Sequence, residues 1–142
     1  MSAELEKAYR TKLEEAVKTG YSILKNGGSS RDAVEESIKI MENSPLFNAG
    51  VGAVLTNDER VSLDASFMSG EDLNAGAIAG SSFIKNPISA AIAVMDKSPH
   101  VLLSSKGADD FAIKKGIDTV PNSYFITERR LQSLRKIKES NN

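Results

Sequence analysis

Apolar residues recur at helical spacing in the first part of the chain and predict two helices. The first runs from about Ala3 to Asn26, and its expected inner face consists of Tyr9, Leu13, Ala16, Val17, Gly20 and Leu24. Asn26-Gly27-Gly28 predicts its end, because glycine readily takes the left-handed conformation that terminates helices. A second helix is expected after a cap at Ser29 or Ser30 and before Pro45, with an inner stripe of Ala33, Val34, Ser37, Ile38 and Met41.

In the middle of the chain the spacing of apolar residues becomes typical of strands. A strand-like segment at Ala53-Val54-Leu55-Thr56 precedes a turn over residues 57–60. Strict alternation of apolar and polar residues from Val61 to Phe67 then predicts a half-buried strand. From Ala75 to Ile84 the residues on both faces of the expected strand are small and apolar, which is typical of a strand covered on both faces.

The last part of the chain predicts further helices and one short strand. Asn86 and Pro87 are the expected cap and first residue of a helix to about Met95, because proline lacks only an N–H that the first turn leaves unpaired. A strand is expected at Val101–Ser104, a helix at Ser105–Lys115 ended by Gly116, a last helix from Ser123 to about Lys138, and a flexible tail over residues 131–142. This order suits a layered α+β domain spanning residues 1–142.

Composition narrows the class of protein. The chain has 142 residues, no cysteine and a formal net charge of −1. Disulfides and thiolate metal sites are therefore excluded, and a near-neutral charge gives no long-range attraction to nucleic acid. No run approaches the roughly 18 apolar residues of a membrane span, and the first residues do not resemble a signal peptide. We therefore expect a soluble cytoplasmic protein with no nucleic-acid and no membrane partner.

Residues 45–52, Pro45-Leu46-Phe47-Asn48-Ala49-Gly50-Val51-Gly52, fit neither a helix nor a strand. Pro45 fixes one backbone angle, whereas Gly50 and Gly52 permit unusual ones. This combination predicts a loop held in a special shape, of the kind that presents backbone carbonyls and single polar side chains.

This segment resembles the ion-binding loop of the plant-type asparaginases, also called isoaspartyl peptidases. The resemblance continues in order through the rest of the chain, from Asp32 to Arg130. Further matching stretches are Leu63-Asp64-Ala65-Ser66-Phe67-Met68, Leu73–Gly80, Asn86–Ala91, Met95–Leu103, Gly107–Ala112 and Tyr124–Arg130. The order and spacing of these stretches identify the family far more specifically than any one of them.

The resemblance implies the four-layer αββα sandwich of the N-terminal-nucleophile hydrolases, of which this chain would supply part. It implies hydrolysis of L-asparagine or of β-aspartyl dipeptides by a threonine that self-cleavage leaves at a new N-terminus. A threonine hydroxyl is a poor nucleophile, and its own α-amine can act as the base. The threonines of this chain all lie outside such a motif: Thr11, Thr19, Thr56, Thr119 and Thr127. We therefore expect an α subunit whose nucleophile lies on a β subunit from the same precursor, assembled as (αβ)₂.

The resemblance also implies roles for the loop. Asn48 is expected to orient the nucleophile or its water; the alternative is an asparagine that only satisfies its own loop. A structural sodium ion is implied, with no cofactor for catalysis. Backbone carbonyls suit such an ion because hard cations prefer oxygen. The implied ligands are the carbonyl oxygens of Met41, Glu42, Ser44, Phe47, Ala49 and Val51.

Other polar residues favour structural roles. Asp64 and Ser66 alternate with core positions, so we expect both on the opposite face of the sheet, with structural hydrogen-bonding roles. The basic residues of the last helix predict a solvated face: Arg129, Arg130, Arg135, Lys136 and Lys138. The family's opening strand ending in His-Gly-Gly has no counterpart, because the single histidine is His100 and Gly27-Gly28 follows a helix.

Two other functions stay open. The first is a non-catalytic, truncated family member that acts as a binding or scaffold domain. The second is a glycosylasparaginase or a threonine aspartase, which the Leu46-Phe47-Asn48-Ala49-Gly50 segment disfavours.

Overall fold

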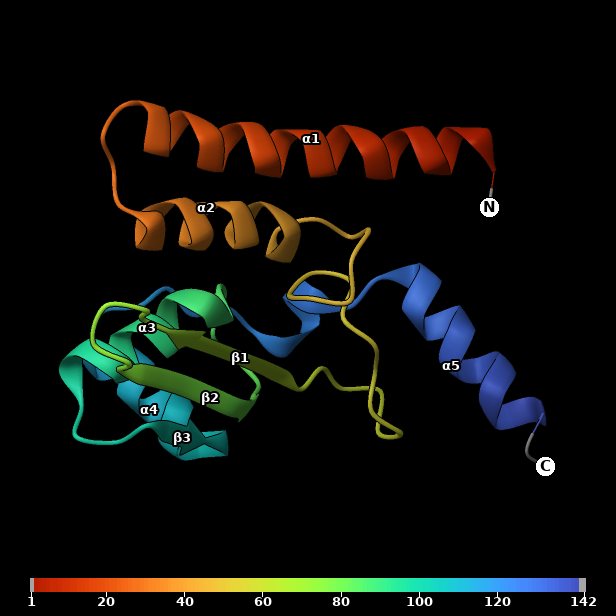
Figure 1. The fold of residues 1–142 in the computed structure, drawn as a ribbon. Helices are drawn as coiled ribbons and strands as arrows, with labels where there is room; N and C mark the ends of the chain where they lie inside the picture. Colours follow the sequence, from red (N-terminus) through yellow and green to blue (C-terminus); the bar gives the residue numbers. More distant parts are fainter. Residues whose placement is uncertain (1, 141–142) are drawn as a thin grey trace.

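A computed structural model describes residues 2–140 and begins with two antiparallel helices, α1 (Ala3–Lys25) and α2 (Ser30–Glu42) (Figure 1). The predicted cap is confirmed at Ser29, whose hydroxyl accepts a hydrogen bond from the Asp32 N–H at 3.0 Å. The helix end is confirmed at Gly27, where φ is +81°. The hairpin therefore follows the local signals closely.

The inner face of α1 is narrower than its apolar pattern predicts. Ala16 and Gly20 are buried, whereas Leu13, Val17 and Leu24 are exposed, Val17 by 70%. The small residues explain this difference, because a Cβ on Gly20 would lie 2.6 Å from the Ser37 hydroxyl oxygen. The helices approach so closely at Gly20 that the larger side chains remain on the flank of the hairpin.

A three-stranded sheet follows, in the order β1-β2-β3. Strand β1 (Leu63–Met68) pairs antiparallel with β2 (Ala75–Ser81), and β2 pairs parallel with β3 (Leu102–Ser104). The predicted strand at residues 53–56 is wrong: this segment forms only an isolated bridge between Leu55 and Val61. Its propensity is strand-like, but the described residues provide no neighbouring strand to extend the pairing.

Helices α3 (Pro87–Lys97) and α4 (Ser105–Lys114) pack on one face of this sheet (Figure 1). Gly76 permits the contact, since a Cβ there would lie 2.1 Å from the Ala91 carbonyl oxygen. The core between these layers is small and aliphatic, and its buried members are Ile78, Ile84, Ala90, Val94, Ala108 and Ala112. The domain thus places one helical layer behind its sheet.

The opposite face of the sheet carries no layer from residues 2–140 (Figure 1). Met68 and Leu102 remain exposed there, and Ala75 to Ile84 is therefore covered on one face and not on two as predicted. The described chain consists of one sheet and one helical layer, with the α1–α2 hairpin beside them. The α+β class is confirmed, and residues 2–140 by themselves do not test the four-layer sandwich of which this chain was expected to supply part.

The last predicted helix is divided into a 3₁₀ turn, η1 (Asn122–Phe125), and α5 (Glu128–Ser140). The division lets the fully buried Phe125 ring enter a second core with Ala53, Val61 and Leu63. Residues 131–140 of the expected flexible tail continue α5, which has no buried residue, and residues 141–142 lie outside the described part. Among residues 2–140, no helix has both the length and the apolar character to cross a bilayer.

Candidate functional site

The segment 44–52, termed here the carbonyl loop, leaves the end of α2 and folds back onto it. The Val51 N–H donates to the Glu42 carbonyl oxygen at 2.8 Å, and the Ala53 N–H donates to that of Gly50 at 3.2 Å. Gly50 has a φ of +48°, and a Cβ there would lie 2.2 Å from the Glu42 carbonyl oxygen. Only glycine fits this position without moving the backbone, which confirms the special loop shape predicted from the glycines.

Asn48 lies exposed in this loop and braces its far end. Its side-chain oxygen Oδ1 accepts a hydrogen bond from the Val54 N–H at 2.8 Å. Among residues 2–140, its side-chain nitrogen Nδ2 has no hydrogen-bond acceptor. Asn48 also borders a cavity of about 230 Å³ that Glu42, Asp64 and Pro87 help to line. Both expected functions are therefore compatible with the geometry, since one end of the amide holds the loop and the other is available.

The six carbonyl oxygens expected to bind the sodium ion, from the end of α2 and from the loop, divide into two groups. The described residues donate to those of Met41 and Glu42, through the N–H groups of Ser44 and Val51. Within residues 2–140, no hydrogen bond reaches four of the expected ligand oxygens, those of Ser44, Phe47, Ala49 and Val51. Unpaired carbonyl oxygens are the ligands that an alkali cation requires, so the donor set fits the implied sodium ion.

Side chains offer no competing metal site in the described part of the chain. Residues 2–140 contain no group of three histidine, cysteine, aspartate or glutamate side chains arranged to hold a metal ion. A cation in this region would therefore depend on the main chain of the carbonyl loop.

The Glu42 side chain joins the end of α2, from which the carbonyl loop leaves, to the start of α3, a role that was not predicted from the sequence. Its side chain is only 3% exposed, and its two oxygens accept from the Ile88 N–H at 2.9 Å and from the Asn86 amide at 3.0 Å. It thereby supplies the capping contact to α3 that Asn86, although at the predicted N-cap position, does not make. Burial raises the pKa of the Glu42 carboxyl above its ordinary value, and the two donors oppose this shift.

One local signal pointed to this contact. The helix dipole favours cations at the last turn of a helix, so an acidic residue at the last position is unfavourable there unless it has hydrogen-bond donors. Glu42 occupies that position in α2. Its partner in α3 could not be inferred, because 46 residues separate Glu42 from Ile88.

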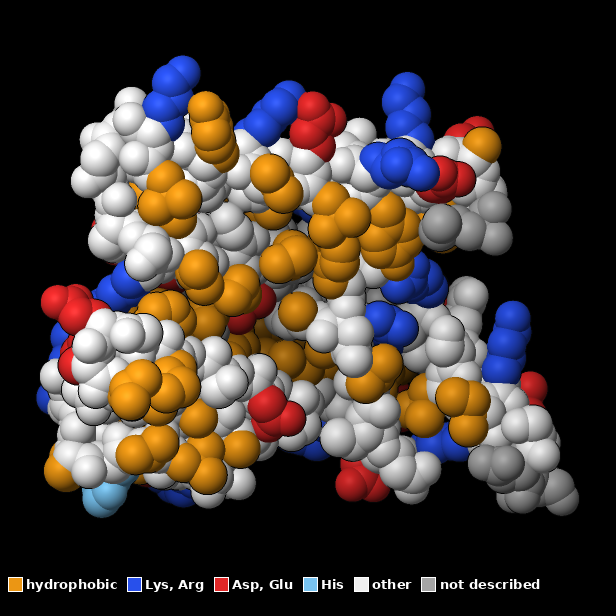
Figure 2. Space-filling view, in the orientation of Figure 1, with side chains coloured by type: hydrophobic (Ala, Val, Ile, Leu, Met, Phe, Trp, Pro, Cys, Tyr) orange, Lys and Arg blue, Asp and Glu red, His pale blue; other side chains and the backbone are white. Residues whose placement is uncertain are grey.

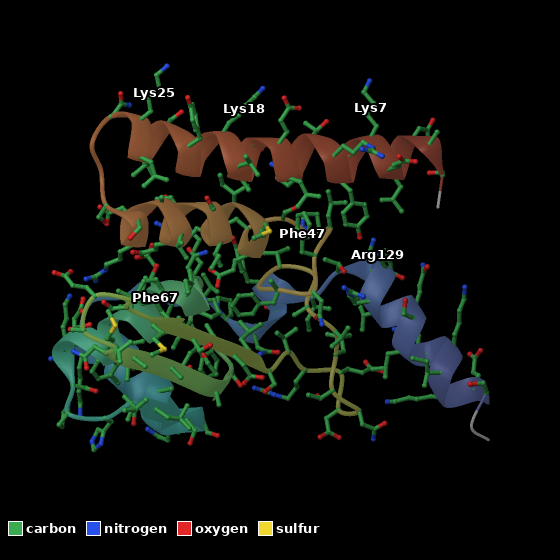
Figure 3. The ribbon with its side chains drawn as sticks, in the orientation of Figure 1. Lys7, Lys18, Lys25, Phe47, Phe67 and Arg129 are labelled. Atoms are coloured by element: carbon green, nitrogen blue, oxygen red, sulfur yellow. The ribbon has the colours of Figure 1, made fainter. Side chains whose placement is uncertain are left out.

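Three further side chains contact the loop, Tyr9 from α1 and Arg129 and Arg130 from α5. The Tyr9 hydroxyl of α1 donates to the Leu46 carbonyl oxygen at 2.5 Å, and the Tyr9 ring meets Phe47 edge to face at 5.5 Å. Arg129 and Arg130 reach the loop from the first turn of α5; Figure 3 shows Phe47 beside α1 and Arg129 at the start of α5. Arg130 is half-buried, so the prediction of a solvated basic face is wrong for it, whereas Arg129 is exposed as predicted although it also reaches the loop.

The position predicted for the two sheet residues is confirmed, but within residues 2–140 the Ser66 side chain forms no hydrogen bond. Asp64 and Ser66 are exposed on the face away from α3. The Asp64 carboxylate accepts a hydrogen bond from the Gly80 N–H at 2.7 Å, where Gly80 has a φ of +66°. This contact satisfies a main-chain N–H at an irregular point of β2, so the structural role expected for Asp64 is confirmed.

Comparison with known proteins decides the family. A family model described as asparaginase matches residues 1–142. This chain belongs to the asparaginase family. It is 44% identical to an isoaspartyl peptidase/L-asparaginase of Bos taurus over 97% of its own length, and 44% identical to an isoaspartyl peptidase of Escherichia coli over 94%. It is 45% identical to an isoaspartyl peptidase/L-asparaginase of Homo sapiens over 87%.

The chain corresponds to less than half of each of these relatives. It spans 45% of the Bos taurus protein, 42% of the Escherichia coli protein and 40% of the human protein. The family is thus established for this chain, and what the relatives' names state about activity is a property of those longer proteins.

Proposed function

We propose that this chain is the α-subunit portion of an asparaginase/β-aspartyl peptidase that hydrolyses side-chain amides with a threonine carried by a β subunit. The observation that carries this proposal is similarity along almost the whole chain to peptidases and asparaginases more than twice as long. A β subunit from the same precursor, an (αβ)₂ assembly and a cytoplasmic location, all expected from the resemblance, form part of the proposal.

The uncovered face of the sheet supports the need for a companion. Figure 2 shows hydrophobic side chains over the sheet and along α1 and α2 on the face toward the viewer. The exposed large apolar side chains of these elements include Met68 and Leu102 in the sheet and Val17 and Leu24 in α1. Contiguous apolar surface of this kind usually marks an interface. A second sheet from the β subunit, packed on Met68 and Leu102, would remove it from water.

The proposed reaction divides its tasks between the two subunits. The β-subunit threonine hydroxyl attacks the side-chain amide carbon, and its α-amine, with an ordinary pKa near ~8, takes the hydroxyl proton. The C–N bond then breaks, ammonia or an amine leaves with that proton, and water hydrolyses the acyl-threonine ester. Asn48 donates its free side-chain N–H to the hydroxyl or to the attacking water, while its Oδ1 holds Val54.

In this proposal the carbonyl loop keeps Asn48 in place. A sodium ion bound by the carbonyl oxygens of Met41, Glu42, Ser44, Phe47, Ala49 and Val51 would stiffen the loop between α2 and Asn48. Its role is structural, because a singly charged alkali ion polarises a substrate weakly.

A matched pair of variants tests the function in the protein produced from its complete gene. Ammonia release from L-asparagine and cleavage of a β-aspartyl dipeptide are measured for the unmodified protein, Asn48→Asp and Asn57→Asp. Asn48→Asp keeps the acceptor for Val54 but loses the donor, so kcat should fall by about 100-fold, as for the loss of one transition-state donor. Asn57 lies in an exposed turn, and the same charge change there should leave kcat unchanged. A folded protein without either activity would instead support the binding or scaffold alternative.

A further inference from the structure

The first turn of α5 holds the carbonyl loop at two points, one on each side of Asn48. Arg129 reaches the carbonyl oxygen of Leu46, and Arg130 reaches that of Gly52. We propose that Arg129 and Arg130 are positioning residues that fix Asn48 for the reaction. The catalytic part of this inference rests on the proposed function, and the mechanical part does not.

Arg130 makes the shorter of the two contacts. Its Nε donates to the Gly52 carbonyl oxygen at 2.6 Å, and its side chain is half-buried. The Gly52 N–H donates in turn to the Phe125 carbonyl oxygen at 3.0 Å. The end of η1 and the first turn of α5 therefore hold Gly52 through its N–H and its C=O, respectively. Both arginines are charged donors, which form stronger hydrogen bonds than neutral ones, and the shorter contact makes Arg130 the principal anchor.

Arg129 completes a three-way contact at the other end of the loop. Its Nη2 donates to the Leu46 carbonyl oxygen at 3.3 Å, and its Nη1 donates to the Tyr9 hydroxyl oxygen at 3.4 Å. The Tyr9 hydroxyl donates to the same carbonyl oxygen. Leu46 is thus held from α1 and from α5 together, and the Phe47 ring beside it packs on Tyr9.

Both arginines donate to main-chain carbonyl oxygens of the loop, and Arg129 also donates to the Tyr9 hydroxyl. Within residues 2–140, neither Arg129 nor Arg130 forms an ion pair with a carboxylate. The rest of α5 buries no residue, so the helix is anchored mainly at this first turn (Figure 1). The position of α5 and the position of Asn48 are consequently linked, and loosening one loosens the other.

Hydrogen exchange of the protein produced from its complete gene tests the mechanical link. The variants are Arg130→Met, Arg129→Met and the control Arg135→Met, an exposed arginine on the same helix. In Arg130→Met, the amides of Val51, Gly52 and Val54 should exchange about 10- to 100-fold faster, because their hydrogen bonds, to Glu42, Phe125 and Asn48 respectively, hold the loop in place. Ile78 in the core should be unaffected, and Arg135→Met should match the unmodified protein.

Steady-state kinetics on the same variants test the catalytic link. Arg130→Met should lower kcat by about tenfold with little change in KM, because Asn48 acts on the reacting hydroxyl or water and makes no substrate contact in this proposal. Arg130→Lys, which retains a donor, should recover part of the loss. If Arg130→Met does not fold, Arg129→Met and Arg130→Lys carry both tests.

The outcomes separate the two proposals. Unchanged exchange at Val51, Gly52 and Val54 in all Arg129 and Arg130 variants would overturn the positioning role. Faster exchange with an unchanged kcat would also overturn it, because Asn48 would then not need the anchor. Faster exchange in a protein that hydrolyses neither substrate would refute the proposed function and leave only the mechanical link standing.

Discussion

The buried pair Glu42 and Asn86 permits an exchange of side chains that tests how α2, the carbonyl loop and α3 are joined. In Glu42→Gln, one oxygen still accepts from the Ile88 N–H, but an amide group now faces the Asn86 amide across a contact of 3.0 Å. Loss of one bond to a charged acceptor and an unsatisfied buried donor should together cost about 2 kcal/mol.

Asn86→Asp alone should be more harmful. It places a second carboxylate against Glu42 where the two residues are only 9% and 3% exposed, and like charges in such a site disfavour ionisation of both. It also removes the donor to the Asn43 side-chain oxygen, at 3.2 Å. We estimate about 3 kcal/mol for the combined loss.

The double variant Glu42→Gln/Asn86→Asp reverses donor and acceptor and restores the pair. It should cost about 2 kcal/mol and not the roughly 5 kcal/mol expected for independent changes, a coupling of about 3 kcal/mol. The assay is denaturant unfolding of all four proteins from the complete gene, compared only if their slopes agree. Losses in the double variant equal to the sum of the single losses would show that the Glu42–Asn86 bond does not join these elements.

Three further changes test separate parts of the structure. Ser105 has a φ of +48°, so Ser105→Gly should stabilise the protein by about 1 kcal/mol. Ser104 has a φ of −135°, so Ser104→Gly should not stabilise it. Equal effects of the two substitutions in thermal unfolding would argue against backbone strain at Ser105. Gly50→Ala should destabilise the protein by at least about 2 kcal/mol, because the new Cβ meets the Glu42 carbonyl oxygen. Gly70 has open space around it, so Gly70→Ala should change the free energy of unfolding by no more than about 0.5 kcal/mol. Comparable unfolding midpoints for the two variants would refute the described loop shape. Replacing sodium with choline at constant ionic strength should lower the melting temperature of the full-length protein, and an unchanged temperature would count against a sodium ion on the carbonyl loop.

Local chemistry was sufficient to predict most of the helices. Ser29, Gly27 and Pro87 act over a few residues, and the ends they predict for α1, α2 and α3 are confirmed. The strand at residues 53–56 was wrong because a strand needs neighbours, and Leu55 has only a single bridge. The last helix was divided because Phe125 enters a core that forms only after folding.

The candidate site was predictable only in part. The glycines and Pro45 indicated the carbonyl loop, and the family resemblance implied Asn48 and the carbonyl ligands. The contacts that hold the loop join residues far apart in sequence, 78 positions for Arg130 and Gly52 and 37 for Tyr9 and Leu46. No pattern in one sequence reports such pairs. Arg129 and Arg130 lie on a polar helix, which indicates solvated side chains. Only the structure shows that they donate to the carbonyl oxygens of Leu46 and Gly52.

The most direct test of the two-subunit proposal is the intact mass of the protein purified from its complete gene. We predict two tightly associated polypeptides, one containing residues 1–142 and another whose first residue is threonine. A single uncut polypeptide that still releases ammonia from L-asparagine would contradict the proposal that the attacking hydroxyl is created by cleavage and contributed by a separate subunit.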